Sequence, residues 1–106
     1  MLALTVEMPD NQVTLRVDTL LLNDEIAVVG ASGELFSEIS NRIKDQSPAK
    51  HTLVFGCCNG HCMYVPTREG VEAGGYGADP LVAWVPVGTA EKMIEKAVQN
   101  ITTLMN

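Results

Sequence analysis

Basic residues are scarce in this chain. Its 106 residues include seven Lys or Arg against 13 Asp or Glu, and the formal net charge is −6. The seven basic residues are scattered along the sequence without clustering. Nucleic acids and anionic membranes require a concentrated basic surface, so neither is an expected partner.

Long apolar runs and targeting signals are also missing. No apolar run approaches the roughly 20 residues that a membrane-spanning helix needs. The segment Met1–Glu7 lacks the basic start and the long apolar stretch of a signal peptide. The three cysteines are an odd number crowded into six positions, which is not the pattern of a disulfide framework. These absences indicate a soluble, cytoplasmic protein with reduced thiols and no membrane span.

The composition is typical of one folded domain. Apolar residues make up 46% of the sequence, and no low-complexity segment, internal repeat or linker interrupts it. A chain of this length can enclose a single core and has no room for two. We therefore expect residues 1–106 to form a single domain.

The first third of the chain alternates between apolar and polar residues, as half-buried strands do. Two alternating runs, 2–8 and 13–17, flank the turn residues Pro9-Asp10-Asn11 and predict an antiparallel hairpin with one buried face. Asn23-Asp24 predicts a second tight turn. The apolar run Ile26–Val29 then predicts an interior strand, buried on both faces.

A helix and a second interior strand are expected next. The helix runs from about Glu34 to Asp45, with Ser32 as its N-cap, and Ser47-Pro48 stops it. The residues of its apolar stripe are Leu35 or Phe36, Ile39 and Ile43. The run His51–Phe55 predicts a strand that is again buried on both faces. It would lie parallel to the first interior strand, joined by a right-handed crossover.

Two further helices are expected in the C-terminal half. Thr67 caps a short helix that Gly74-Gly75 ends. The run Leu81–Val85 is either an edge strand or an apolar loop, because prolines flank it. Thr89 caps a closing helix, whose apolar stripe is Ile94, Ala97, Val98, Ile101 and Met105. The predicted fold class is α/β: a small mixed β-sheet with an N-terminal antiparallel hairpin, a β-α-β crossover and a C-terminal helix packed on the sheet.

The stretch from Phe55 to Tyr76 concentrates the groups that could carry chemistry. It contains four possible zinc ligands: Cys57, Cys58, His61 and Cys62. Structural zinc sites, however, use ligand pairs held apart in sequence, whereas these four lie within six residues. Activation of Cys62 by the adjacent His61 is disfavoured too, because neighbours on a turn seldom reach the required geometry. The expected role of the cysteines is that of small buried hydrophobes.

Several short segments together resemble one protein family. The segments are Asn23–Gly30, Ser32–Ile39, Ser47-Pro48, Asn59-Gly60, Tyr64–Thr67 and Gly74–Tyr76. In order and spacing they resemble the C-terminal part of the catalytic domain of the neutral/alkaline (non-lysosomal) ceramidases, over about residues 20–105. Tyr64 and Tyr76 stand twelve residues apart with Val-Pro-Thr between them, as two tyrosines of that family do.

The resemblance implies a zinc amide hydrolase site, because ceramidases of this family are zinc amidases that cleave the N-acyl bond of ceramide. It implies that Glu34 and Tyr64 are zinc ligands and that Tyr76 is a catalytic residue near the scissile amide. At such a site zinc polarises a carbonyl and activates water. The residues expected to form the surrounding pocket are Cys57, Asn59, Gly60, His61 and Thr67.

The chain also departs from the family pattern. The two zinc-binding histidines and the active-site serine of the family come from a long N-terminal region, which this sequence does not contain. Neither His51 nor His61 matches those positions, and Ser32 and Gly77 replace a proline and an acidic residue of the family. Zinc is therefore the implied cofactor, with an incomplete ligand set. Met1 and the regular first hairpin favour a small complete gene product or a bounded domain.

Three functions remain open. The first is a free-standing relative of the ceramidase subdomain without a complete zinc site. It would bind a partner or a second copy, with a dimer expected, through apolar surface left open. The residues of the candidate surface are Leu81, Val82, Trp84 and Val85. The second is a metal-dependent amidase completed by a separate catalytic chain, or by His51 or His61 of a neighbouring copy. The third is a small-molecule binding protein that uses the pocket around Asn59 and Tyr64. The chain alone is not expected to be active.

Overall fold

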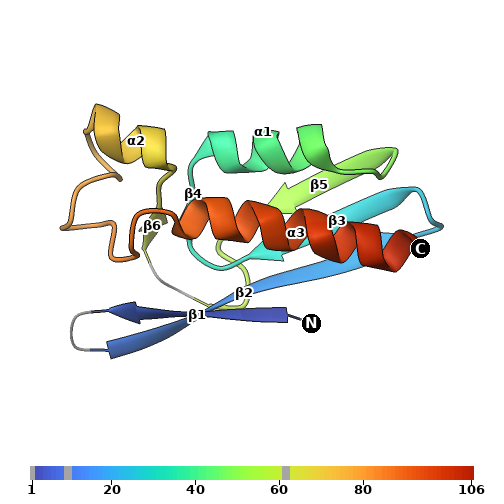
Figure 1. Cartoon of the computed structure of the whole chain (residues 1–106), viewed down its shortest axis with the longest axis horizontal. Helices are drawn as coiled ribbons and strands as arrows, with labels where there is room; N and C mark the ends of the chain where they lie inside the picture. Colours follow the sequence, from blue (N-terminus) through green and yellow to red (C-terminus); the bar gives the residue numbers. More distant parts are fainter. Residues whose placement is uncertain (1, 9–10, 61–62) are drawn as a thin grey trace.

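A four-stranded sheet is the central element of the fold (Figure 1). The computed structural model describes residues 2–8, 11–60 and 63–106. The strands of the sheet, in spatial order, are β1 (Leu2–Met8), β2 (Asn11–Leu22), β3 (Ile26–Ala31) and β5 (His51–Phe55). β1, β2 and β3 are successively antiparallel, whereas β5 is parallel to β3. The expected mixed sheet and N-terminal hairpin are confirmed; Pro9 and Asp10 of the expected turn lie outside the described residues.

The turn between β2 and β3 is the one that the sequence predicted. Asn23 and Asp24 adopt positive φ angles of 51° and 56°, a conformation that Asn and Asp tolerate better than most residues. The backbone N–H of Glu25 donates to the carbonyl of Leu22 at 3.0 Å and closes the turn.

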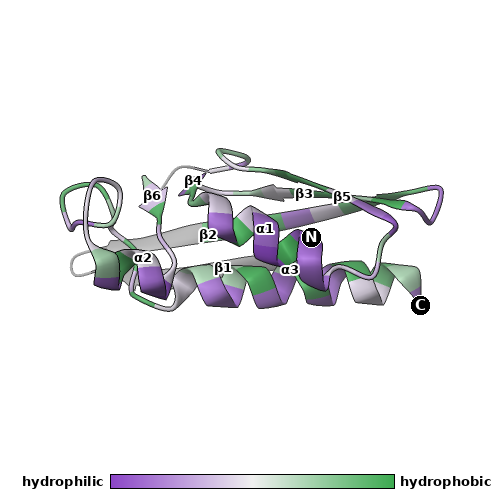
Figure 2. Cartoon of the chain, turned by 90° about the horizontal axis from the view of Figure 1, so that it is seen from above, coloured by the Kyte–Doolittle hydropathy of each residue, from purple (hydrophilic) through white to green (hydrophobic). Residues whose placement is uncertain are grey.

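Two helices cover one face of the sheet. α1 (Ser37–Gln46) connects β3 to β5, and α3 (Thr89–Met105) packs on β2 and on α1. Figure 2 shows both helices on the same side of β3 and β5. The buried side chains of β3 belong to the core on that side and are Ala27, Val29 and Ala31. The expected β-α-β crossover and the C-terminal helix on the sheet are confirmed.

Most of the predicted apolar stripes reach the core. In α1 the buried residues are Ile39 and Ile43, as expected. The buried apolar residues of α3 are Ala90, Met93, Ile94, Ala97 and Ile101. Val98 and Met105 were expected in this stripe, but Val98 is half-buried and Met105 is exposed. The stripe extends toward the start of α3 instead, because that end packs against α1 and the sheet.

The predicted start of the first helix is wrong, because Glu34 is in a strand. β4 (Glu34–Leu35) pairs in parallel with β6 (Tyr64–Val65) and forms a second, two-stranded sheet. The backbone N–H of Glu34 donates to the carbonyl of Met63 at 2.8 Å, and that of Phe36 donates to the carbonyl of Val65 at 3.2 Å. This pairing joins residues about 30 positions apart, so no local propensity could reveal it.

Ser32 is not a helix cap either. The N-cap residue of α1 is Phe36, which makes no side-chain capping bond. The Ser32 hydroxyl is fully buried. It accepts a hydrogen bond from the backbone N–H of Arg16 at 3.0 Å and donates to the carbonyl of Cys58 at 3.2 Å. Ser32 therefore joins β2 to the loop that follows β5.

The expected burial of β5 on both faces is wrong. Thr52 and Val54 are half-buried on the side of the helices, while His51, Leu53 and Phe55 are exposed on the other side. β3 is similar, because Ile26 and Val28 are only half-buried. Both helices cover the same face, so the second apolar side of these strands is left open.

The C-terminal half contains one more helix, α2 (Arg68–Ala73). Its predicted cap is confirmed: the N–H of Gly70 donates to Thr67 Oγ1 at 3.0 Å. Gly74, with a φ of 77°, ends the helix as expected.

The segment before α3 is a loop. Within Leu81–Val85 only an isolated bridge from Ala83 to Met63 is strand-like, so of the two alternatives the loop is the one adopted. Thr89 is the first residue of α3 and does not cap it; the N-cap is Gly88, at a φ of 99°. The Thr89 hydroxyl donates instead to the carbonyl of Pro86 at 2.7 Å.

Candidate functional site

Glu34 and Tyr64 are direct neighbours across the small sheet. The parallel register of β4 and β6 pairs Glu34 with Tyr64 and Leu35 with Val65. Glu34 is exposed and Tyr64 is half-buried. Burial raises the pKa of Tyr64, and the nearby Glu34 carboxylate raises it further, because a negative charge disfavours the phenolate. The structure thus places a carboxylate beside a neutral phenol.

Tyr76 completes a cluster of three aromatic rings. Its ring meets that of Tyr64 edge to face, with centroids 5.5 Å apart, and Tyr64 meets Phe36 in the same manner at 6.4 Å. Tyr76 is 78% exposed, so its ring is the outer member of the cluster. The two tyrosines that stand twelve residues apart in the sequence are therefore in contact.

Gly77 allows the chain to pass close to these rings. Its φ is 90°, and a Cβ atom there would lie 3.0 Å from the ring of Phe36 and 3.2 Å from that of Tyr64. A larger residue would crowd the rings of Phe36 and Tyr64. Nothing in the sequence around Gly77 indicated this contact.

A hollow of about 370 Å³ lies beside Glu34 and Tyr64. Its polar lining comes from Glu34, Ser37, Ser40, Cys57 and Tyr64. The two serines are three residues apart on α1 and reach the same side of the helix. These serines were not predicted as site residues. Their three-residue spacing places them on one side of a helix, but it points to the hollow only once Glu34 is known to lie in β4, just before that helix.

Of the two cysteines that the structure describes, Cys57 lines the hollow. Its backbone N–H donates to the carbonyl of Gly33 at 2.8 Å, which fixes the loop after β5 against the start of β4. Cys57 is exposed and Cys58 is half-buried, so the expectation of buried cysteines is wrong for Cys57. Cys62 lies outside the described residues.

The other expected pocket residues lie elsewhere. Asn59 turns toward β2, where its Nδ2 donates to Asp18 Oδ2 at 2.6 Å. Gly60 is exposed and does not line the hollow. Thr67 is buried, with its hydroxyl occupied in capping α2. His61 lies outside the described residues.

The donor set fits zinc only in part. A carboxylate and a thiolate are zinc ligands in proteins, and the phenol is a further oxygen donor beside them. Among the described residues, however, no group of three or more His, Cys, Asp or Glu could hold a metal ion. His51 begins β5, and Cys57 follows the opposite end of that strand, so His51 does not reach the hollow. This chain supplies at most the oxygen and sulfur side of such a site.

No helix in the part of the chain that the structure describes is long and apolar enough to cross a membrane. Comparison of the chain with protein-family models, with curated proteins and with solved structures finds no match. The function must therefore be inferred from the geometry of the chain itself.

Proposed function

We propose that this chain carries the oxygen-donor half of a zinc amide hydrolase site and that another polypeptide completes it. The observation that carries the proposal is the pairing of Glu34 with Tyr64, with the Tyr76 ring packed against Tyr64. These are the three residues to which the ceramidase resemblance assigns roles. Alone, the chain is a binding module without a complete active site.

Each of the three side chains has a distinct task in this proposal. Glu34 and Tyr64 would hold the metal, which when bound polarises an amide carbonyl and activates water. A tyrosine phenol is protonated at neutral pH, and the raised pKa of Tyr64 moves its ionisation further from neutrality, so forming the phenolate there would require a cation beside it. Tyr76 is exposed next to Tyr64 and would contact the amide of the substrate.

Zinc titration with added imidazole tests the proposal, since imidazole can stand in for the missing histidines. We expect the chain alone to retain no stoichiometric zinc and to show no amidase activity. With zinc and imidazole together, we expect the near-ultraviolet absorption of a tyrosinate to develop at neutral pH. Tyr76→Phe should keep this signal, Tyr64→Phe should lose it, and Glu34→Gln should weaken zinc binding.

Glu38→Gln is the matched control. Glu38 is an exposed carboxylate on α1 and does not line the hollow, so this variant should behave like the unchanged chain. If no tyrosinate signal forms at any zinc concentration, or if Glu38→Gln weakens binding as much as Glu34→Gln, the half-site proposal is wrong.

A small-molecule binding function is the second candidate, and the hollow favours it. Its volume of about 370 Å³ falls within the range of ligand pockets, roughly 300–1,000 Å³. A ligand that binds the native state raises the melting temperature, so a thermal-shift screen would find it. Ser40→Leu should fill the hollow and abolish the shift.

We also propose a cytoplasmic location. Cys57 and Cys58 are both free, which fits a compartment that keeps thiols reduced. Cell fractionation followed by thiol labelling would test it: we expect the protein in the cytosolic fraction with both thiols reactive toward the label.

A further inference from the structure

One side of β2, β3 and β5 is largely apolar and mostly exposed, although Cys58 and Asn59 of the loop after β5 lie over Gly30 and Asp18 at one end of it. This side lies opposite α1 and α3, and Figure 2 shows no helix on that side of β3 and β5. The cross-strand register aligns Leu20, Val28 and Leu53 in one row across β2, β3 and β5. We call this surface the open face, and its apolar residues are Leu20, Leu22, Ile26, Val28, Leu53 and Phe55.

The open face is unusual for a parallel strand pair. Parallel strands normally have both faces covered, and their sequences are apolar on both sides for that reason. β3 and β5 have such sequences, yet Leu53 is 47% exposed and Phe55 is 53% exposed. On β2, Leu20 is 56% exposed. Contiguous exposed apolar patches of this kind mark interaction surfaces.

The size of the open face suits a second copy of the chain. Leu20, Leu22, Leu53 and Phe55 are each about half exposed, which leaves on the order of 100 Å² per side chain. With Ile26 and Val28, the patch reaches about 500 Å². Two such patches in full contact would bury about 1,000 Å², which is the area that a biological interface should reach and is typical of weak, reversible association.

The charges on this face also permit self-association. The chain has a net charge of −6, so contact between copies should avoid free carboxylates. Among residues 16–22, 26–30 and 51–55, the one carboxylate on the open face is Asp18. It already lies 3.6 Å from Arg16 Nη2 and accepts a hydrogen bond from Asn59.

We propose that two copies of this chain pack open face against open face as a two-fold dimer. Sheet faces stack about 10 Å apart with interdigitated side chains, and a two-fold contact places the same patch on both partners. The proposed function requires a partner polypeptide. At the open face, this partner would be a second copy of the chain. The dimer needs no metal, so its failure and the failure of the zinc proposal are distinguishable.

Sedimentation velocity over a wide concentration range tests the dimer. We expect the unchanged chain to shift from monomer toward dimer as its concentration rises. Leu20→Glu should raise the dimer dissociation constant at least about tenfold, because it places a carboxylate on both sides of the interface. Leu53→Lys tests the same face from another strand. Since both leucines are about half exposed, circular dichroism should show a retained fold.

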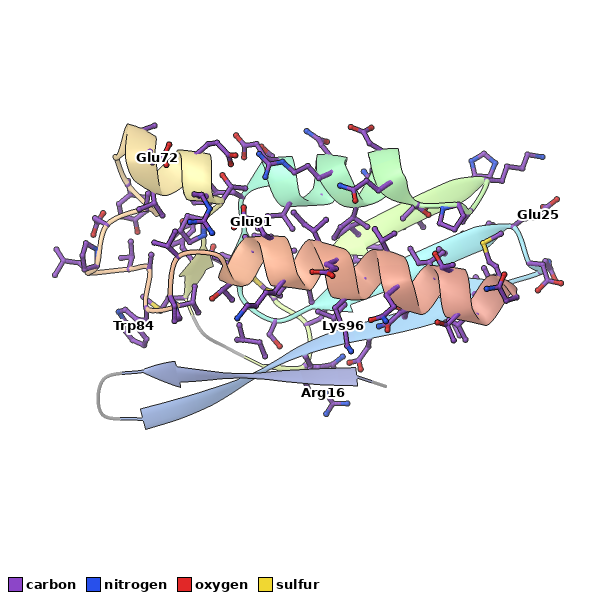
Figure 3. All side chains as sticks on the ribbon, viewed as in Figure 1. Arg16, Glu25, Glu72, Trp84, Glu91 and Lys96 are labelled. Atoms are coloured by element: carbon purple, nitrogen blue, oxygen red, sulfur yellow. The ribbon has the colours of Figure 1, made fainter. Side chains whose placement is uncertain are left out.

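Leu81→Glu is the matched control. Leu81 is 83% exposed and lies in the loop with Trp84, the surface that the sequence suggested for association. Figure 3 shows Trp84 in the loop before α3, and its Nε1 donates to the Leu81 carbonyl at 3.1 Å. A strict monomer at high concentration overturns the proposal. The proposal is also overturned if Leu81→Glu dissociates the dimer while Leu20→Glu and Leu53→Lys leave it intact. Concentration-dependent NMR shifts of the Leu20 and Leu53 methyl groups would support it.

Discussion

The ring of Tyr76 packs edge to face on the ring of Tyr64, with a 77° angle between their planes. Tyr64 in turn lies opposite Glu34 in the small sheet. The site therefore contains a phenol with an aromatic neighbour on one side and a carboxylate on the other. Both neighbours act on the same property, the pKa of Tyr64.

The pKa of Tyr64 can be measured directly in Tyr76→Phe, because Tyr64 is then the only tyrosine of the chain. Burial and the Glu34 carboxylate raise this pKa above its usual value. We expect the additional change Glu34→Gln to lower it, since the negative charge is removed. Spectrophotometric titration is the measurement. Adding Glu38→Gln instead should leave the pKa unchanged, and equal effects of the two changes would contradict this account.

The alkaline stability should follow the same group. A raised pKa means that the folded state binds the proton more tightly than the unfolded state does. Its stabilising contribution is complete below the unfolded pKa of about 10 and is lost as the pH rises through the folded value. Tyr64→Phe should therefore flatten the decline of the melting temperature above about pH 10. A decline as steep as that of the unchanged chain would exclude Tyr64 as its source.

Gly77→Ala should destabilise the ring cluster. The added Cβ would lie 3.0 Å from Phe36 at a φ of 90°, so both contact and conformation oppose it. We expect a loss of about 1–3 kcal/mol in the free energy of unfolding, measured with denaturant. Gly75→Ala is the control, because Gly75 has a similar φ of 102° and nothing within 4 Å of the added atom. If both variants lose the same free energy, the ring contact contributes nothing.

Ser32→Ala should loosen the loop that carries Cys57. The change removes the acceptor of the part-buried Arg16 N–H and the donor to the Cys58 carbonyl. An unsatisfied buried donor costs about 1–3 kcal/mol, so we expect a loss of that order in denaturant unfolding. Faster labelling of Cys58 by a thiol reagent should accompany it. Ser40→Ala changes a half-buried serine on α1 and should stay within about 0.5 kcal/mol.

The sequence predicted the parts of the fold that depend on local chemistry. Asn23-Asp24 makes its turn because both residues tolerate a positive φ. Thr67 caps α2 because its hydroxyl reaches the N–H of Gly70. The alternation of apolar and polar residues in the first strands correctly predicted the hairpin, because the two-residue period of a strand can be seen in consecutive residues.

The candidate site could not be predicted in this way. Glu34 was expected to lie in a helix, and only its long-range pairing with Tyr64 keeps it in a strand. Asn59 was expected at the pocket, but its amide bonds to Asp18, which is 41 positions away. The composition and periodicity of the sequence gave no reason to place Glu34 beside Tyr64. The exposure of one side of β5 was not predicted, because a strand with apolar residues on both faces has the same sequence pattern whether one face or both faces are covered.

Arg42 gives the last prediction, because it links all three helices. Its Nη2 lies 2.9 Å from Glu69 on α2, and its Nη1 lies 3.4 Å from Glu91, which Figure 3 shows on the side of α3 toward α1. The hydrogen bond from Arg42 lowers the pKa of Glu69. A lowered pKa stabilises the fold above the unfolded value and loses that effect as the pH falls through the folded value. Glu69→Gln should therefore lower the melting temperature at neutral pH, and this difference should shrink progressively as the pH falls below about 4. Glu72→Gln, an exposed change on the same helix, should have little effect at either pH. If Glu69→Gln lowers the melting temperature as much in acid as at neutral pH, the ion pair with Arg42 is not the cause of the loss.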